Sequence, residues 1–272
     1  MTSVIQISDT HFGTEQPQVV DALAQLVHEQ SPELVVVSGD ITQRARRAQF
    51  RAAKVFLDSL DARNMVIIPG NHDIPLYDVF TRAFRPYAKF AREFGQELEP
   101  EYESEGLLVI TVKTTRRYRH VDGEVSMKQI ERVAKRLISA KPQQLRIVVT
   151  HQPVSVIRPE DEENLLNGHE KAIPSWCTAG ADLILGGHIH LPYVCPLHER
   201  LGNGARKLWA VQAGTAVSSR IRHEAGNSVN IVRYEPAEPH TIQVEQWDYQ
   251  VGSRKFAMTK VHSLSRDGTV GR

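Results

Sequence analysis

Cysteine is scarce in this chain. Only Cys177 and Cys195 occur among the 272 residues, which are too few for a disulfide framework and too far apart for a metal site built from thiolates. This shortage excludes the class of small secreted proteins that depend on disulfides. The simplest interpretation is two reduced thiols in a protein of the cytoplasm.

Long hydrophobic runs are also missing. The longest, "LVVV" at 34–37 and "LLVI" at 107–110, fall far short of the roughly 20 residues that span a bilayer. The N-terminal "MTSVIQISDTHF" lacks a basic region followed by an apolar stretch and a small-residue cleavage site. We therefore expect a cytoplasmic protein with no membrane span.

An excess of charge of one sign is the third absence. Lys and Arg total 33 and Asp and Glu total 32, giving a net charge of +1, which creates no global field to attract nucleic acid. We interpret the basic clusters at 44–47 and 116–120 as solvated surface charge, although they keep a nuclease open as an alternative. Nucleic acid is not an expected partner.

What the chain does have is a regular alternation of strand and helix signals. Apolar runs at 3–8, 33–40 and 64–73 alternate with helical spacing at 17–30 and 46–60, which predicts the order β-α-β-α-β. The region 207–249 is β-rich without a helical period and predicts a second, largely antiparallel sheet packed on the first. No linker composition appears, so we predict one domain over 1–262 and a flexible tail at 263–272.

The segment 78–94 carries aromatic residues at helical spacing. Pro86 should kink or split this helix. We interpret the aromatic stripe, which includes Phe80, Phe84 and Phe94, as a packed face, and a role as a lid over the active site stays open. The acidic segment 158–170 could border the same pocket.

Polar side chains follow the apolar runs at a constant interval. Asp9, Asp40 and Asn71 are each separated by 31 residues, the length of a strand-helix-strand unit. Because the carboxyl ends of parallel strands collect along one edge, where ligands bind in open α/β folds, we expect these three residues to converge.

Further metal-ligand types stand at the ends of the other apolar runs. The full set is Asp9, His11, Asp40, Asn71, His151, His188 and His190, with His72 next to Asn71. A single zinc site needs three or four ligands, whereas seven candidates with a carboxylate able to bridge suit two ions. On extended segments the i and i+2 side chains share a face, so Asp9 with His11, and His188 with His190, can address one cluster.

Five ordered motifs carry a family resemblance. "DTH" (9–11), "GD" (39–40), "GNHD" (70–73), "TH" (150–151) and "GGHIH" (186–190) resemble those of the calcineurin-like metallophosphoesterase superfamily, most closely its bacterial class III cyclic-nucleotide phosphodiesterase branch. The resemblance implies a four-layer α/β/β/α sandwich of two mixed β-sheets flanked by helices. It places Asp9, His11 and His190 on one ion, Asn71, His151 and His188 on the other, and Asp40 between them.

The resemblance also gives His72 a role. It implies a catalytic imidazole near the leaving group or a phosphoryl oxygen, oriented by an acidic partner, for which Asp9, Asp40 and Asp73 are candidates. Two departures from the family pattern leave the fine tuning of the site open, namely Gln43 and Arg44 after "GD" and Gln152 where a second histidine is frequent.

These features predict a phosphoesterase with two metal ions. Two cations would lower the pKa of a bridging water so that hydroxide attacks phosphorus in line. We expect divalent or mixed-valence ions, with manganese or iron first and zinc, nickel or cobalt as alternatives. The leading substrate is a small phosphodiester such as a cyclic nucleotide, and Arg220, Arg222 and His223 are candidates to touch it.

Alternatives to this function stay open. A phosphomonoesterase, or a hydrolase of a nucleotide-linked lipid or a pyrophosphate, would share the sheets and the metals. A non-catalytic metal-binding scaffold is the alternative of another class, although such a protein should lack some of the ligands or His72. A homo-oligomer is also left open.

Overall fold

The apolar runs of the N-terminal half form the strands of one mixed sheet. In the computed structural model, which describes residues 2–222 and 225–267, this sheet has the order β12-β11-β10-β1-β2-β3. The strands β1, β2 and β3 are parallel, and β10, β11 and β12 are antiparallel. The bounds are β1 Thr2–Ile7, β2 Leu34–Val37, β3 Met65–Ile67, β10 Ser228–Tyr234, β11 Thr241–Gln250 and β12 Lys255–Ser265.

The second sheet is formed by the middle of the chain. Its order is β4-β5-β6-β7-β9-β8, and the strands from β5 to β9 in this row are parallel. The bounds are β4 Glu101–Glu103, β5 Leu107–Thr111, β6 Leu145–Val149, β7 Leu183–Gly186, β8 Tyr193–Pro196 and β9 Trp209–Gln212.

The prediction of a separate antiparallel sheet over 207–249 is wrong about which strands form it. The strands β10 and β11 extend the first sheet, because β10 pairs antiparallel with β1 through Ile231 and Ile5. The strand β9 joins the second sheet parallel to β7. Both sheets are therefore mixed, and each takes strands from distant parts of the sequence.

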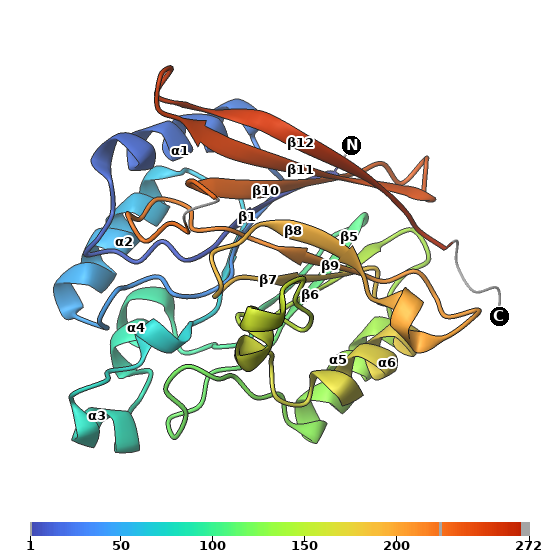
Figure 1. The fold of residues 1–272 in the computed structure, drawn as a ribbon, viewed down its shortest axis with the longest axis horizontal. Helices are drawn as coiled ribbons and strands as arrows, with labels where there is room; N and C mark the ends of the chain where they lie inside the picture. The colour runs from blue at the N-terminus through green and yellow to red at the C-terminus, as the bar shows by residue number, and fades with distance from the viewer. Residues whose placement is uncertain (1, 223–224, 268–272) are drawn as a thin grey trace.

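Alternation along the strands explains why the two sheets stack. In β1, Ile5 faces the helices α1 (Pro17–Gln30) and α2 (Arg47–Ser59), while Val4 faces the other sheet. In β5, Leu108 faces the helices α5 (Met127–Ile138) and α6 (His169–Ala179), while Leu107 faces the first sheet. The layers run helices, sheet, sheet, helices (Figure 1), which confirms the predicted α/β/β/α sandwich.

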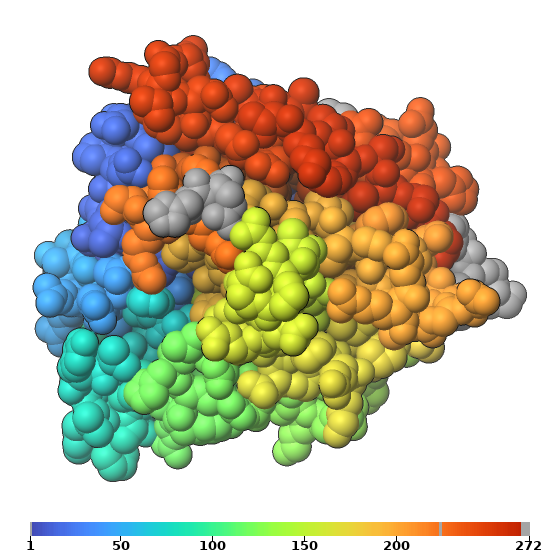
Figure 2. Space-filling view, in the orientation of Figure 1, coloured from blue at the N-terminus to red at the C-terminus, as the bar shows by residue number. Residues whose placement is uncertain are grey.

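The helical segment 78–94 is split as predicted. It forms α3 (Val79–Phe84) and α4 (Ala88–Phe94), with Pro86 between them. Phe90 and Phe94 pack against the core beneath α1 and α2. Phe80 and Phe84 stack on each other and are 74% and 70% exposed. The prediction of a packed aromatic face therefore holds for α4 and is wrong for α3. The helix α3 lies in the cyan corner of the molecule, opposite the red C-terminal strands (Figure 2).

Short 3₁₀ turns complete the described elements. They are η1 Asn71–Asp73, η2 Pro159–Asn164 and η3 His198–Leu201. The first of them is formed by the last three residues of the "GNHD" motif, directly after Pro69 and Gly70, with three residues between it and the end of β3.

The C-terminal strand runs into the predicted tail. β12 continues to Ser265, and the side chain of Arg266 is buried, where it donates to the Gln144 carbonyl and to the Tyr234 hydroxyl. The tail predicted for 263–272 therefore begins inside a strand, and residues 268–272 lie outside the described residues. Among the helices formed by the described residues, none has the length and apolar character to cross a membrane.

Candidate metal centre

Left-handed turns bring the predicted ligands together. Asp9, His11, Asp40, His188 and His190 all have a positive φ, between 42° and 76°. Such a backbone is uncommon outside glycine, and it clusters at functional sites. The predicted extended geometry for Asp9 with His11 and for His188 with His190 is therefore wrong. The i and i+2 side chains meet because the chain turns sharply after β1 and β7.

Small residues allow these turns to touch. A Cβ on Gly70 would overlap the backbone nitrogen of Asp40, and a Cβ on Gly39 would lie 2.5 Å from Nδ1 of His151. Gly39 also has a φ of 98°. The glycines of the "GD" and "GNHD" motifs are thus required for close approach of the turns that follow β2 and β3.

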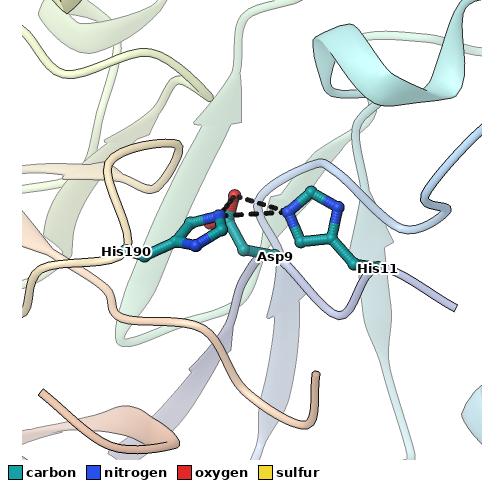
Figure 3. Close-up of side chains that lie close together, drawn as sticks. All are labelled: Asp9, His11 and His190. Atoms are coloured by element: carbon teal, nitrogen blue, oxygen red, sulfur yellow. Dashed lines mark hydrogen bonds and ion pairs between the residues drawn. The ribbon is translucent and has the colours of Figure 1, made fainter. Parts of the chain in front are cut away.

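The first group of ligand types contains Asp9, His11 and His190 (Figure 3). Oδ1 of Asp9 lies 3.3 Å from Nε2 of His190 and 3.8 Å from Nε2 of His11, and the two Nε2 atoms are 3.0 Å apart. Asp9 and His11 are fully buried, and His190 is 9% exposed. One carboxylate and two imidazoles at these distances can hold one metal ion.

The second group contains Asp40, His151 and His188. Nε2 of His151 lies 3.3 Å from Oδ1 of Asp40 and 3.1 Å from Oδ1 of Asn71. The His151 and His188 rings have centroids 5.2 Å apart. Four of the predicted ligands, including the amide oxygen of Asn71, therefore surround this second position.

Asp40 lies between the two groups. Its Oδ1 faces His151, and its Oδ2 lies 3.7 Å from Nε2 of His11, which belongs to the first group. A carboxylate that presents one oxygen to each side is suited to bridge two ions roughly 3.5–4 Å apart. The structure thus brings all seven predicted ligands into one cluster.

Hydrogen bonds orient the ligands and leave specific atoms free. Nδ1 of His151 donates to the Ser38 carbonyl at 2.8 Å, so its Nε2 points into the cluster. The Ser8 hydroxyl donates to Oδ2 of Asp9 at 2.6 Å, and the backbone N–H of His188 donates to the same oxygen at 2.9 Å. The bond from Nδ1 of His151 fixes the tautomer and the orientation of the ring, as is usual for a metal-ligating histidine.

Some of the other ligand atoms form no hydrogen bond with any described residue. Among the described residues, Oδ1 of Asp9 and both ring nitrogens of His188 are buried without a hydrogen bond. Buried polar atoms are costly when unsatisfied. Here they belong to Asp9 in the first group and to His188 in the second group. A divalent cation supplies the missing partner, so the donor set fits metal ions.

The carboxylates of the cluster are held ionised. Burial raises the pKa of the Asp9 carboxyl, but the adjacent His190 and His151 outweigh burial, and the pKa falls well below its usual range. For Asp40, burial is likewise outweighed by His151 and His72, which lower its pKa well below the usual value. Both groups are therefore anionic at neutral pH, as metal ligands must be.

The imidazoles divide into two kinds. Burial lowers the pKa of His11 to about 3 and that of His188 to about 4, so both are neutral and ready to bind metal. Burial acts in the same direction on His151, but Asp40 outweighs it and raises the pKa to about 9. Asp9 likewise overcomes burial and raises the pKa of His190. A metal ion must displace a proton from His151 at neutral pH.

His72 stands at the open side of the cluster. Its Nδ1 donates to the Gln43 carbonyl at 2.9 Å, so Nε2 faces Oδ2 of Asp40 at 4.0 Å, and the side chain is 26% exposed. By distance alone, His11, Asp40 and His72 form a third group able to hold an ion. The ring therefore lies where it can reach either a metal or a substrate.

Nδ1 of His72 is held by a backbone carbonyl and not by Asp73, while Asp40 accepts from the backbone N–H of His72 at 2.8 Å. Asp73 instead accepts from the backbone N–H groups of Gly70, Ile41 and Thr42 at 2.9, 3.0 and 2.8 Å, which joins the turn after β2 to the turn after β3. The residue type of Gln43 does not predict this contact, because any residue can present a main-chain carbonyl.

The other residues predicted to touch substrate are placed differently. Arg220 reaches the cluster, with Nη1 3.2 Å from Nε2 of His72. Arg222 instead pairs with Asp161 of η2 at 2.9 Å, which ties the 158–170 segment to the loop after β9. His223 lies outside the described residues.

Known protein families and relatives agree with the geometry of the site. Residues 2–192 match the family described as calcineurin-like phosphoesterase. The chain belongs to this family. A bacterial relative from Arcobacter nitrofigilis, named "Probable glycerophosphodiester phosphodiesterase GpdQ", is 24% identical over 262 residues, which cover 92% of this chain and 90% of that protein.

Solved structures of related fold include two phosphatases. A dimetal phosphatase from Danio rerio has a TM-score of 0.67 at 13% identity. The match covers 98% of this calcineurin-like phosphoesterase and 99% of the Danio rerio protein. The purple acid phosphatase PPD1 from yellow lupin has a TM-score of 0.70 at 14% identity. The same 98% of this chain spans 54% of the lupin protein. These similarities show the fold, and the family shows a metal-dependent phosphoesterase.

Proposed function

We propose that this phosphoesterase hydrolyses a small phosphodiester at two metal ions. The observation that carries the proposal is the position of His72 beside a bridging carboxylate, with Nδ1 held by the Gln43 carbonyl and Nε2 turned toward the cluster. A diester that releases an alcohol needs a proton donor at this place. In this proposal Asp9, His11 and His190 hold one ion, Asn71, His151 and His188 hold the other, and Asp40 bridges.

The bound ions would activate water and neutralise the phosphate oxygens. The chain itself supplies the buried metal ligands and the proton for the leaving group. Because the Gln43 carbonyl can only accept, Nδ1 of His72 carries a hydrogen, and a second proton must reside on Nε2 for delivery to the departing alkoxide. The backbone N–H of His72 donates to Oδ1 of Asp40 at 2.8 Å and fixes the ring relative to the bridging carboxylate.

A cavity lies beside His72 and offers room for a leaving group. Its volume is about 150 Å³. It is lined by Gln43, Arg44, Asn71, His72, Ile74, Leu76, Arg82, His120 and Val121. A groove of about 900 Å³ along α5 is lined by none of the cluster residues and plays no part in the proposal.

Two substrate classes fit this arrangement. The resemblance of the motifs favours a cyclic nucleotide, and the name of the Arcobacter relative favours a glycerophosphodiester. Both release an alkyl alcohol whose departure benefits from His72. The mixed set of imidazole, carboxylate and amide ligands suits manganese or iron, and the free thiols of Cys177 and Cys195 suit a reducing cytoplasm.

A substrate panel tests the proposal. The protein is stripped of metal, loaded with Mn²⁺, and assayed with glycerophosphoethanolamine, a 3′,5′- and a 2′,3′-cyclic nucleotide, a nitrophenyl phosphomonoester and a pyrophosphate-linked dinucleotide. We expect kcat/KM for at least one diester to exceed that for the monoester and the pyrophosphate by tenfold or more. A preference for either of those two substrates would replace the diesterase with the corresponding alternative. Absence of any turnover in a fully loaded protein would favour the non-catalytic scaffold.

A further inference from the structure

A guanidinium group enters the cluster from the loop after β9. Nη1 of Arg220 lies 3.0 Å from Oε1 of Gln43, 3.2 Å from Nε2 of His72 and 3.4 Å from Nδ1 of His11. It thus reaches both the proposed proton donor and one of the proposed metal ligands. Among the described residues, no other arginine or lysine is within hydrogen-bond distance of the eight cluster side chains.

Hydrogen bonds connect the main chain of Arg220 to the first group of ligands. The carbonyl of Arg220 accepts from Nδ1 of His190 at 2.6 Å, and its backbone N–H donates to the Ser218 hydroxyl at 3.2 Å. Ser218 in turn contacts the Thr215 hydroxyl at 2.8 Å, and Thr215 donates to the Asp9 carbonyl at 2.6 Å. These bonds fix the main chain of Arg220 relative to the first group of ligands and leave the side chain to reach across the cluster.

The partners of this guanidinium are uncharged acceptors. They are one amide oxygen and two imidazole nitrogens, and no carboxylate of the described residues lies within 4.0 Å of it. Arg222, two residues later, is paired with Asp161. A guanidinium stays charged at all ordinary pH values and is matched in geometry to carboxylate and phosphate oxygens. Arg220 therefore has the capacity to bind an anion.

One of the three acceptors is lost when the centre binds metal. A histidine that binds metal through Nε2 carries its hydrogen on Nδ1, so Nδ1 of His11 can no longer accept from Arg220. Oε1 of Gln43 and Nε2 of His72 then remain as protein partners of Nη1, at the open side of the cluster.

We propose that Arg220 is a further catalytic residue, which binds a non-bridging phosphoryl oxygen of the substrate and of the product beside His72. This assignment rests on the proposed phosphoester chemistry and adds the group that recognises the oxyanion. Oxygen ligands on the phosphorus gain negative charge as the reaction proceeds, and a positioned guanidinium stabilises that charge. No covalent step is added, since the arginine only donates hydrogen bonds.

Phosphate binding tests the proposal without turnover. The Mn²⁺-loaded protein is titrated with inorganic phosphate by calorimetry, and the same titration is made with Arg220→Met, Arg220→Lys and the control Arg92→Met. Arg92 lies on α4 with a side chain 60% exposed, so its loss changes the net charge equally. We expect about 10- to 100-fold weaker phosphate binding for Arg220→Met, the range of one charge-assisted hydrogen bond. Arg220→Lys should be intermediate, and Arg92→Met should be unchanged.

Metal content and chemical rescue distinguish a direct contact between the Arg220 side chain and phosphate from a structural role in positioning the metal ligands. The main-chain bonds to His190 and Ser218 survive all substitutions, so elemental analysis should find the same metal content in each variant. Guanidinium ions at millimolar concentration should restore part of the lost turnover to Arg220→Ala, because they can occupy the vacated place. A purely structural role would give no rescue.

Unchanged phosphate affinity in a metal-replete Arg220→Met protein would overturn the proposal. So would loss of metal in both Arg220→Met and Arg220→Lys, since the effect would then come from the ligands. If the substrate panel reveals a monoesterase in place of a diesterase, the phosphate titration still decides the role of Arg220, because both reactions have a phosphoryl oxyanion.

Discussion

Replacement of His72 by alanine should slow the release of poor leaving groups and spare good ones. An alkoxide is a strong base that needs a proton as it departs, whereas a nitrophenolate is stable as an anion. The proposed proton donor is Nε2 of His72, because Nδ1 is engaged by the Gln43 carbonyl at 2.9 Å. We therefore expect His72→Ala to discriminate between an alkyl diester and a nitrophenyl diester.

The structure sets the size of this effect. General acid catalysis is typically worth 10²- to 10⁴-fold, about 3–5 kcal/mol. The His72 ring contacts the Gln43 carbonyl and Nη1 of Arg220 and remains 26% exposed, so water can partly replace it as a proton source. We expect the lower part of the range, about 10²- to 10³-fold, for an alkyl diester and less than about tenfold for a nitrophenyl diester.

Single-turnover kinetics of the Mn²⁺-loaded protein provide the assay, because they isolate the chemical step. His120→Ala is the matched control, since His120 is an exposed histidine that lines the same cavity and contacts none of the proposed metal ligands among the described residues. Metal content should remain at the wild-type value. Equal slowing of both substrates with metals retained would refute the acid role, and loss of an ion would show that His72 belongs to the third group as a ligand.

Three other outcomes follow from the cluster. Asp40→Asn should lower metal occupancy as well as rate, because Oδ1 and Oδ2 face different groups, and full occupancy by elemental analysis would contradict a bridge. Mn²⁺ binding at pH 7.5 should release about one proton from His151, whose pKa is raised to about 9 by Asp40. The apparent affinity should therefore rise with pH up to about 9, as calorimetry in buffers of different ionisation heat can show. In the metal-free protein, the same shift stabilises the fold fully below about pH 6.5 and the contribution is lost as the pH rises through about 9. Gly70→Ala should reduce both metal affinity and the free energy of unfolding by about 1–3 kcal/mol, because its Cβ would overlap the Asp40 backbone, while Gly252→Ala, with open space around it, should change neither.

The sequence predicts the layers of the fold and most of the site because these depend on local signals. Apolar alternation places Val4 and Ile5 on opposite faces of β1, and polar residues at strand ends are visible as motifs. Strand order is different, since it depends on pairing between distant segments. The contact of Ile5 with Ile231 joins β1 to β10, and no local pattern distinguishes it from a pairing within a separate C-terminal sheet.

Backbone roles are the second limit of sequence reasoning. The predicted alternation of Asp9 and His11 on an extended segment gives the right neighbours for the wrong reason, since both residues have a positive φ. The group that holds His72 is the carbonyl of Gln43, which any residue could present. Exposure of Phe80 and Phe84 is likewise invisible in the helical spacing of α3, because the partners of a helix face lie elsewhere in the chain.

The metal stoichiometry tests the central claim most directly. The protein is stripped with a chelator, shown by elemental analysis to be free of transition metals, and then titrated with Mn²⁺ while hydrolysis of a diester is followed. The account predicts no turnover in the stripped protein and recovery that saturates at two ions per chain. Undiminished turnover in the stripped protein, or full recovery at one ion per chain, would contradict a binuclear centre built from Asp9, His11, Asp40, Asn71, His151, His188 and His190.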